Sequence, residues 1–235
     1  MLLETSGLVK RFGGVVAVNA IDLAVAEGEV FGLIGPNGAG KTTLINLISG
    51  QLRADGGSVH FAGADVTRLR PDQLARRGIA RTFQAIRLFK GLTVLENVRL
   101  GGFVRGGSPL RARALLERMG LAARANALAG ELAYGDQRRL EIARALAADP
   151  KLLILDEPAA GMNPTESAAL RELLRSLGAE GITTVLIEHD VRLVMGACDR
   201  VAVLSFGRKI AEGTPADVQG DPVVRDAYLG SDDDA

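Results

Sequence analysis

The chain has 235 residues, of which 47% are hydrophobic and 24% are charged, so it is long enough to bury a large core and has an ordinary globular composition. Lys plus Arg and Asp plus Glu are balanced at 28 each, and no run of Lys or Arg exceeds two residues. This balance argues against a nucleic acid partner, because such partners are bound by a basic patch or stripe.

No apolar run approaches the roughly 18 residues that a bilayer-spanning helix needs, and the start of the chain lacks the pattern of a signal peptide. Cys198 is the single cysteine and stands in an apolar stretch, so we expect a buried side chain and a reducing compartment. The sequence therefore predicts a cytosolic chain whose contact with any membrane depends on a partner.

Short apolar alternations run from residue 2 to residue 30, with turn residues at 13–14 and 27–29. Such alternation is typical of strands with one buried face, so a small antiparallel sheet is predicted here. A further short strand is predicted over residues 58–61, after the glycine turn at 55–57.

Residues 35–42 fill every fixed position of the phosphate-binding P-loop pattern, between a predicted buried strand at 29–34 and a predicted helix at 43–48. Glycines let successive backbone N–H groups point into one concavity, and the positive N-terminus of the helix faces the same anion. Lys41 is expected to reach the β- and γ-phosphates, and the hydroxyl of Thr42 to take one Mg²⁺ position. A glycine turn that merely precedes Lys-Thr is the alternative, but the flanking elements favour nucleotide binding. The predicted contacts are Gly35, Pro36, Asn37, Gly38, Ala39, Gly40, Lys41, Thr42 and Thr43.

Residues 71–148 are predicted to be mostly helical, with a flexible connector at 101–107. From residue 151 onward, strands and helices alternate, which is typical of a parallel α/β sheet. The whole chain, residues 1–235, is therefore predicted to be a single α/β domain. A helical subdomain is expected at about residues 85–148, and a flexible acidic tail at 231–235. Strands are expected at 152–155, 183–187 and 201–204, and helices are expected near 110–119 and 135–148 and from residues 165 and 191 onward.

Two carboxylates follow the apolar run at residues 152–155, at the strand end where α/β sheets bind ligands. Asp156 is expected to hold the Mg²⁺ shell, and Glu157 to face the water that attacks the γ-phosphate. A solvated strand end before a turn is the alternative, but the P-loop favours the functional interpretation. The sequence between Lys41 and Asp156 is too long for adjacent βαβ units of about 30 residues each, which favours a helical insertion.

This order of motifs resembles the nucleotide-binding subunits of ATP-binding-cassette transporters over nearly the whole chain. The resemblance implies that Phe12 stacks on adenine and that Gln84 senses Mg²⁺ and the membrane partner. It also implies that His189, which follows the strand predicted at 183–187, contacts the γ-phosphate. A structural role is the alternative for Phe12 and His189, since a lone Phe is often core and a strand-end His is often a surface residue.

The chain departs from the family pattern in two places. The signature motif usually reads Leu-Ser-Gly-Gly-Gln and grips the phosphate bound by the opposite subunit, whereas residues 132–137 read Leu-Ala-Tyr-Gly-Asp-Gln. After the two carboxylates, the usual Ser-Ala-Leu-Asp is replaced by Ala-Gly-Met-Asn at 160–163. Both departures put in doubt whether a homodimer of this chain would hydrolyse ATP at two equal sites. The signature residues expected at the partner's nucleotide are Ala133, Tyr134, Gly135 and Asp136.

These departures, and the chain ending at 225–230, are similar to the LivG-type subunits of bacterial branched-chain amino acid importers. The resemblance implies a second ABC ATPase subunit, most simply in a heterodimer with a homodimer left open, two membrane permeases and, indirectly, a solute-binding protein. It also implies a peripheral position at the cytoplasmic face of the inner membrane. Two alternatives are a lipopolysaccharide-export-type ABC ATPase and a non-transport ABC nucleotide switch, but the signature argues against the first. The short insert, single cassette and balanced charge argue against the second.

Overall fold

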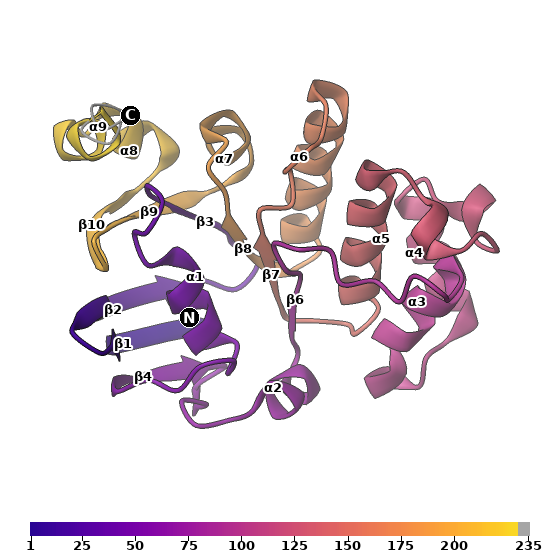
Figure 1. The fold of residues 1–235 in the computed structure, drawn as a ribbon, viewed down its shortest axis with the longest axis horizontal. Coiled ribbons are helices and arrows are strands. Elements are labelled where there is room, and N and C mark those ends of the chain that lie inside the picture. Colours follow the sequence, from indigo (N-terminus) through magenta and orange to yellow (C-terminus); the bar gives the residue numbers. More distant parts are fainter. Residues whose placement is uncertain (230–235) are drawn as a thin grey trace.

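Two β-sheets form the body of the protein in the computed structural model, which describes residues 1–229 (Figure 1). The smaller sheet is antiparallel, with strand order β2-β1-β4-β5, and confirms the N-terminal layer predicted from the alternations. Its strands are β1 (Leu3–Phe12), β2 (Val15–Val25), β4 (Gly56–Phe61) and β5 (Ala64–Asp65).

The larger sheet has strand order β10-β9-β3-β8-β7-β6, and only β10 runs antiparallel to its neighbour. β3, β7 and β8 are buried along their whole length, which explains their unbroken apolar sequences. The strands are β3 (Val30–Ile34), β6 (Ile79–Arg81), β7 (Leu152–Asp156), β8 (Thr183–Ile187), β9 (Arg200–Ser205) and β10 (Arg208–Gly213).

Alternate residues of the central strand β3 belong to two separate cores. Phe31 and Leu33 pack with α1 (Lys41–Ile48) and the antiparallel sheet, while Val30 and Ile34 belong to the core on the other face. That second face is covered by α6 (Pro164–Ala179) and α7 (Val191–Ala197) (Figure 1), and the chain continues into α8 (Pro215–Gly220) and α9 (Pro222–Leu229). The sheet is thus the middle layer of three.

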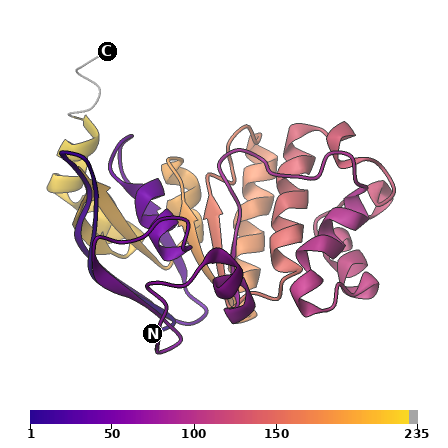
Figure 2. The same ribbon diagram turned by 60° about the horizontal axis from the view of Figure 1, so that its bottom comes forward.

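The helical part of the chain lies beyond α6, on the side away from the antiparallel sheet (Figures 1 and 2). It contains α3 (Val94–Gly101), α4 (Pro109–Arg118) and α5 (Tyr134–Leu146), joined by short 3₁₀ turns, the first of which lies in the predicted connector. The expectation that residues 71–148 are mostly helical is wrong at Ile79–Arg81, which follow α2 (Pro71–Arg77) and pair with β7 as an edge strand. Three residues are too few to show a strand period, so only the pairing with β7 reveals this strand. The tail predicted at 231–235 lies outside the described residues.

Within residues 1–229, no helix is long and apolar enough to cross a bilayer. Cys198 is buried as expected, at the end of α7 against Gly32 of β3. Burial, together with the nearby carboxylates of Asp199 and Glu29, raises the pKa of its thiol to about 12.

The thiol of Cys198 is expected to resist alkylation in the folded protein, because the thiolate is the nucleophile and burial disfavours it. Reaction with iodoacetamide at pH 8 should be slow in native buffer and fast in guanidinium chloride, as followed by mass spectrometry of the intact chain. Equal rates in the two buffers would contradict the burial of this side chain.

Candidate functional site

Four loops meet at the carboxyl edge of the large sheet. The P-loop follows β3, and Gln84 follows β6. Asp156 is the last residue of β7 and Glu157 comes directly after it, while His189 follows β8. Because these strands are parallel, their carboxyl ends lie at one edge, which is the usual ligand site of open α/β sheets.

The P-loop is fixed to its surroundings by close backbone approaches at two glycines. A Cβ on Gly35 would collide with the carbonyl oxygen of Leu204 in β9, and one on Gly40 with the carbonyl oxygen of Ala17 in β2. Both residues have positive φ angles, of 149° and 101°. Gly38 also has a positive φ, of 78°, but no atom of the described part of the chain lies within 4 Å of the position its Cβ would take. The glycines of this loop therefore allow both the positive φ angles of its turns and the close packing of its backbone against β9 and β2.

Lys41 lies over the P-loop, where its ammonium group donates to the carbonyl oxygens of Gly35 (2.6 Å) and Pro36 (3.0 Å). Burial lowers the pKa of Lys41, while the carboxylates of Glu157 and Asp156 act in the opposite direction. The lysine is therefore pre-positioned beside the loop that is predicted to hold phosphate.

The three residues predicted for the metal line one cavity of about 400 Å³, which the structure forms between the P-loop helix and the loop after β6. They are Thr42, Gln84 and Asp156, and they offer a hydroxyl, an amide and a carboxylate oxygen. This donor set fits Mg²⁺, which prefers hard oxygen ligands and keeps several waters.

Glu157 lies within reach of Gln84, which is predicted to sense Mg²⁺, and of His189, which is predicted to contact the γ-phosphate. Its Oε2 accepts from Nε2 of Gln84 at 3.0 Å, and its Oε1 is 4.0 Å from Nδ1 of His189. The backbone of Glu157 has φ of 50°, which costs energy in a residue with a Cβ and is typical of functional positions. His189 remains 66% exposed, so its imidazole is open to a ligand.

Two side chains that sequence reasoning missed hold these loops in place. Glu188 is buried, and its carboxylate accepts from the backbone N–H of Ala159 (2.8 Å) and of His189 (3.2 Å). Burial raises the pKa of Glu188, and the backbone donors oppose that shift. Arg81 forms a buried ion pair with Asp156, with 2.8 Å between Nη2 and Oδ2. Arg81 lies three residues before Gln84, and Glu188 lies directly before His189. Only the burial of their side chains distinguishes them from ordinary surface charges.

Phe12 lies at the end of β1, where it pairs with Val15 across the hairpin and is 48% exposed. The ammonium group of Lys10 lies 5.5 Å from the centre of its ring. The exposed ring is compatible with a stacking platform, and the same hairpin strand, β2, approaches the P-loop at Ala17 and Gly40.

The signature residues are not brought to this chain's own P-loop. They begin α5, which Figures 1 and 2 place beyond β7 and α6 from α1. Ala133 is the N-cap residue of α5 and makes no side-chain hydrogen bond to the helix. The first backbone N–H groups of α5 are therefore not capped by this side chain, and the positive end of the helix dipole lies there. The negative charge expected of Asp136 is balanced by an ion pair with Arg139, one turn along the helix.

The two departures from the family pattern contact each other. A Cβ on Gly161 would lie 2.9 Å from the ring of Tyr134, and a Cβ on Gly135 would lie 2.5 Å from Oε1 of Glu166. The hydroxyl of Tyr134 accepts from Arg138 at 3.1 Å. The start of α5 therefore packs against the loop after β7. The ring of Tyr134 leaves no room for a side chain at residue 161.

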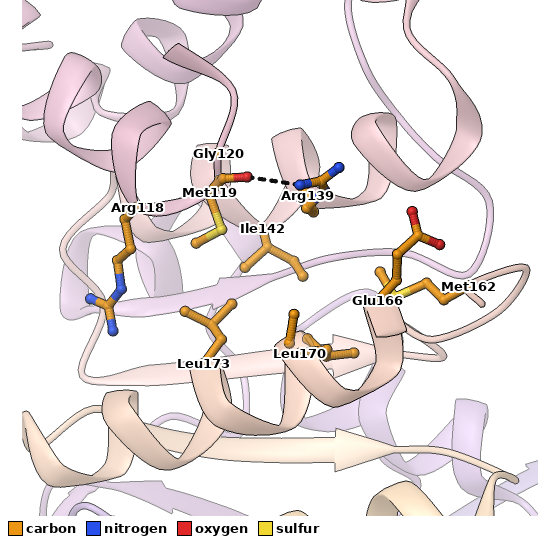
Figure 3. A pocket seen from close by; sticks show the side chains of 10 residues that line it. Arg118, Met119, Gly120, Arg139, Ile142, Met162, Glu166, Leu170 and Leu173 are labelled. Atoms are coloured by element: carbon orange, nitrogen blue, oxygen red, sulfur yellow. Dashed lines mark hydrogen bonds between the residues drawn. The ribbon is translucent and has the colours of Figure 1, made fainter. Parts of the chain in front are cut away.

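A second cavity, of about 280 Å³, separates α5 from α6 (Figure 3). Its walls are mainly apolar, with Arg118 on one side and Glu166 on the other, and a hydrogen bond from Arg139 to the carbonyl oxygen of Met119 crosses its edge. It contains none of the residues predicted to bind nucleotide. The remaining wall residues are Gly120, Ile142, Met162, Ala169, Leu170 and Leu173.

Known families and proteins resemble this chain over most of its length. Residues 18–160 match the family described as ABC transporter, and residues 208–234 match that described as branched-chain amino acid ATP-binding cassette transporter. The chain is 45% identical to the high-affinity branched-chain amino acid transport ATP-binding protein LivG of Salmonella typhimurium, over 97% of this chain and 98% of that one. It is 43% identical to BraF of Pseudomonas aeruginosa, with the same shares covered.

Among solved structures, a nucleotide-free ATP-binding cassette from an ABC transporter superposes with a TM-score of 0.88 at 37% identity, covering 97% of this chain and 98% of that one. A dimeric cassette bound to ADP and phosphate superposes with a TM-score of 0.83 at 28% identity, covering 91% and 99%. The sequence matches, the shared fold and the P-loop geometry lead to one conclusion: the chain belongs to the ABC transporter family of ATP-binding cassettes.

Proposed function

We propose that this chain is the ATP-hydrolysing subunit of an importer of branched-chain amino acids. The observation that carries the proposal is the convergence of the P-loop, Asp156, Glu157, Gln84 and His189 at one sheet edge, in a chain 45% identical to LivG. The fold alone would support any cassette, and the named relatives supply the solute class.

Nucleotide binding follows from the P-loop. Bound Mg²⁺ and ATP would supply the phosphoryl group whose transfer to water releases the free energy for transport. Lys41, which now donates to two carbonyl oxygens, would donate to phosphate oxygens instead, and Phe12 would stack on the adenine. Thr42, Asp156 and the amide oxygen of Gln84, which line one cavity, would hold the metal shell.

Hydrolysis follows from the carboxylate of Glu157. It orients the attacking water and takes up its proton, while Gln84 and His189 hold the carboxylate and the phosphate in place. The amide nitrogen of Gln84 already donates to Glu157, so any movement of the loop after β6 changes the position of the carboxylate. That loop is the expected route from the permeases to the chemistry.

A second subunit completes the site, because α5 lies far from this chain's own P-loop (Figure 1). Ala133 provides no hydroxyl, so the signature of this chain gives a partner's phosphate only backbone amides and the helix dipole. We therefore propose a heterodimer with an ATPase subunit of complete signature, docked on two permeases at the cytoplasmic face of the membrane and served by a solute-binding protein. A dimeric cassette stands among the similar structures, which supports the pairing of two such subunits.

Uptake of radiolabelled leucine tests the solute class. In cells that carry the transporter with this subunit, uptake should exceed that of cells carrying Lys41→Ala, and excess isoleucine or valine should compete while an unrelated dipeptide should not. Uptake that is equal in the two strains would contradict the proposal.

The pairing is tested by ATPase activity against concentration of the purified chain. We expect slow turnover at all concentrations until a partner with a complete signature is added. Activity that rises with the square of concentration for this chain alone would show a competent homodimer instead.

A further inference from the structure

Arg81 is a buried cation at the expected metal site. Its side chain is 7% exposed and that of Asp156 is 3% exposed, and the two residues belong to the neighbouring parallel strands β6 and β7. The cavity of about 400 Å³ that holds Thr42 and Gln84 is lined by both members of this pair. The carboxylate expected to meet Mg²⁺ therefore already has a counter-charge.

Every nitrogen of the Arg81 guanidinium has a partner. Nη1 donates to Oδ1 of Asn46 (2.6 Å) and Oγ of Ser49 (2.9 Å), and Nε donates to the carbonyl oxygen of Thr82 (3.2 Å). Asn46 lies on α1, the helix that begins with the P-loop lysine, and Ser49 follows its last residue. The guanidinium also lies 5.0 Å from the ring centre of Phe83. A rigid fork of donors thus joins the P-loop helix to the strand end that carries Asp156.

The pair has opposite effects on the metal-free protein and on metal binding. A buried carboxylate without a partner is costly, so Arg81 stabilises the fold while Asp156 has no metal. A divalent cation that enters the same cavity meets the guanidinium as a like charge and must share the carboxylate with it. The ion pair uses Oδ2 of Asp156, which leaves Oδ1 as an acceptor for the metal shell.

We propose that Arg81 is a positioning residue that holds Asp156 in the metal-free protein and, by sharing this carboxylate with the incoming cation, sets the affinity of the nucleotide site for Mg²⁺. The inference rests on the proposed role of Asp156 at the metal. Arg81 keeps the P-loop helix joined to the end of β7 before the metal binds.

Thermal unfolding at saturating ADP tests the proposal, because ADP is not hydrolysed during the measurement. In EDTA, Arg81→Met should lower the Tm, since Asp156 is left buried without a partner. Addition of MgCl2 should raise the Tm of Arg81→Met by more than it raises the Tm of the parent protein. The Mg²⁺ concentration that gives half of this rise should fall by about tenfold, within the usual range for coupling between two ligands.

A matched control is Arg200→Met, which leaves the buried carboxylate of Glu29 without its arginine at the opposite edge of the same sheet. Its Tm should fall equally in EDTA and in MgCl2, and its Mg²⁺ midpoint should stay that of the parent. Arg81→Lys keeps the charge but loses the fork of hydrogen bonds. We expect a lower Tm with a midpoint close to that of the parent. Arg81→Gln loses the charge but keeps amide donors, so its midpoint should fall as in Arg81→Met, and it keeps the test available if Arg81→Met fails to fold.

The outcomes separate this inference from the proposed metal role. A Mg²⁺ midpoint that Asp156→Asn shifts and Arg81→Met leaves unchanged would overturn the role of Arg81 alone. A midpoint that Asp156→Asn also leaves unchanged would overturn the metal role of Asp156, and this inference with it. The double variant Arg81→Met/Asp156→Asn should regain Tm in EDTA relative to Arg81→Met, because no buried charge is left unpaired, and should lose the enlarged response to Mg²⁺.

Discussion

Replacement of Glu157 by Gln is expected to lower ATP turnover by about 10²- to 10⁴-fold, the usual contribution of a general base. Gln keeps the size of the side chain but cannot take up the proton of the attacking water. Nucleotide binding should persist, because the P-loop and Lys41 do not depend on this carboxylate. An ATP-bound dimer with the partner subunit should therefore accumulate, and phosphate release together with light scattering would detect the two effects.

Glu172→Gln is the matched control, since Glu172 lies exposed on α6 and, among residues 1–229, pairs only with arginines of the same helix. Its turnover should equal that of the parent protein. Undiminished turnover in Glu157→Gln would show that the proton leaves by another route, and the role proposed for this residue would then be wrong.

Gly40→Ala should abolish nucleotide binding and lower the Tm, although it adds a single methyl group. The new Cβ would collide with the carbonyl oxygen of Ala17, so the P-loop and β2 would have to separate. Gly38→Ala introduces the same methyl group at a positive φ with open space around it, and it should cost only about 1–2 kcal/mol of backbone strain.

Binding of a fluorescent ADP analogue and thermal unfolding of both variants would measure the difference. The comparison separates close packing from backbone strain, because the two glycines share a loop and a left-handed conformation. Equal loss of binding in both variants would mean that strain, and not contact with β2, makes Gly40 necessary.

The parts of the fold that the sequence predicted correctly are those whose pattern lies within one continuous segment of the chain. The strand, P-loop and helix over residues 29–48 carry their pattern locally, and so does the apolar strand that ends in Asp156 and Glu157. β6 was missed because three residues show no period and its identity depends on pairing with β7. Side-chain partners across strands, such as Arg81 with Asp156, likewise depend on distant chain segments.

One missed partner could have been found. Asp136 and Arg139 are three residues apart on a predicted helix, a spacing that places side chains on the same face. The pair balances the negative charge that Asp136 brings to the signature motif. The contact of Tyr134 with Gly161 could not be predicted, because nothing local to either motif indicates that the two loops touch.

The most direct test of the central claim is ATP hydrolysis by the complete transporter in lipid vesicles, measured with and without its solute-binding protein loaded with leucine. If this chain provides the catalytic site of a branched-chain amino acid importer, leucine-loaded binding protein should raise hydrolysis, and Glu157→Gln should abolish both the rise and leucine accumulation. Hydrolysis that does not respond to leucine, or leucine accumulation that survives Glu157→Gln, would contradict the claim.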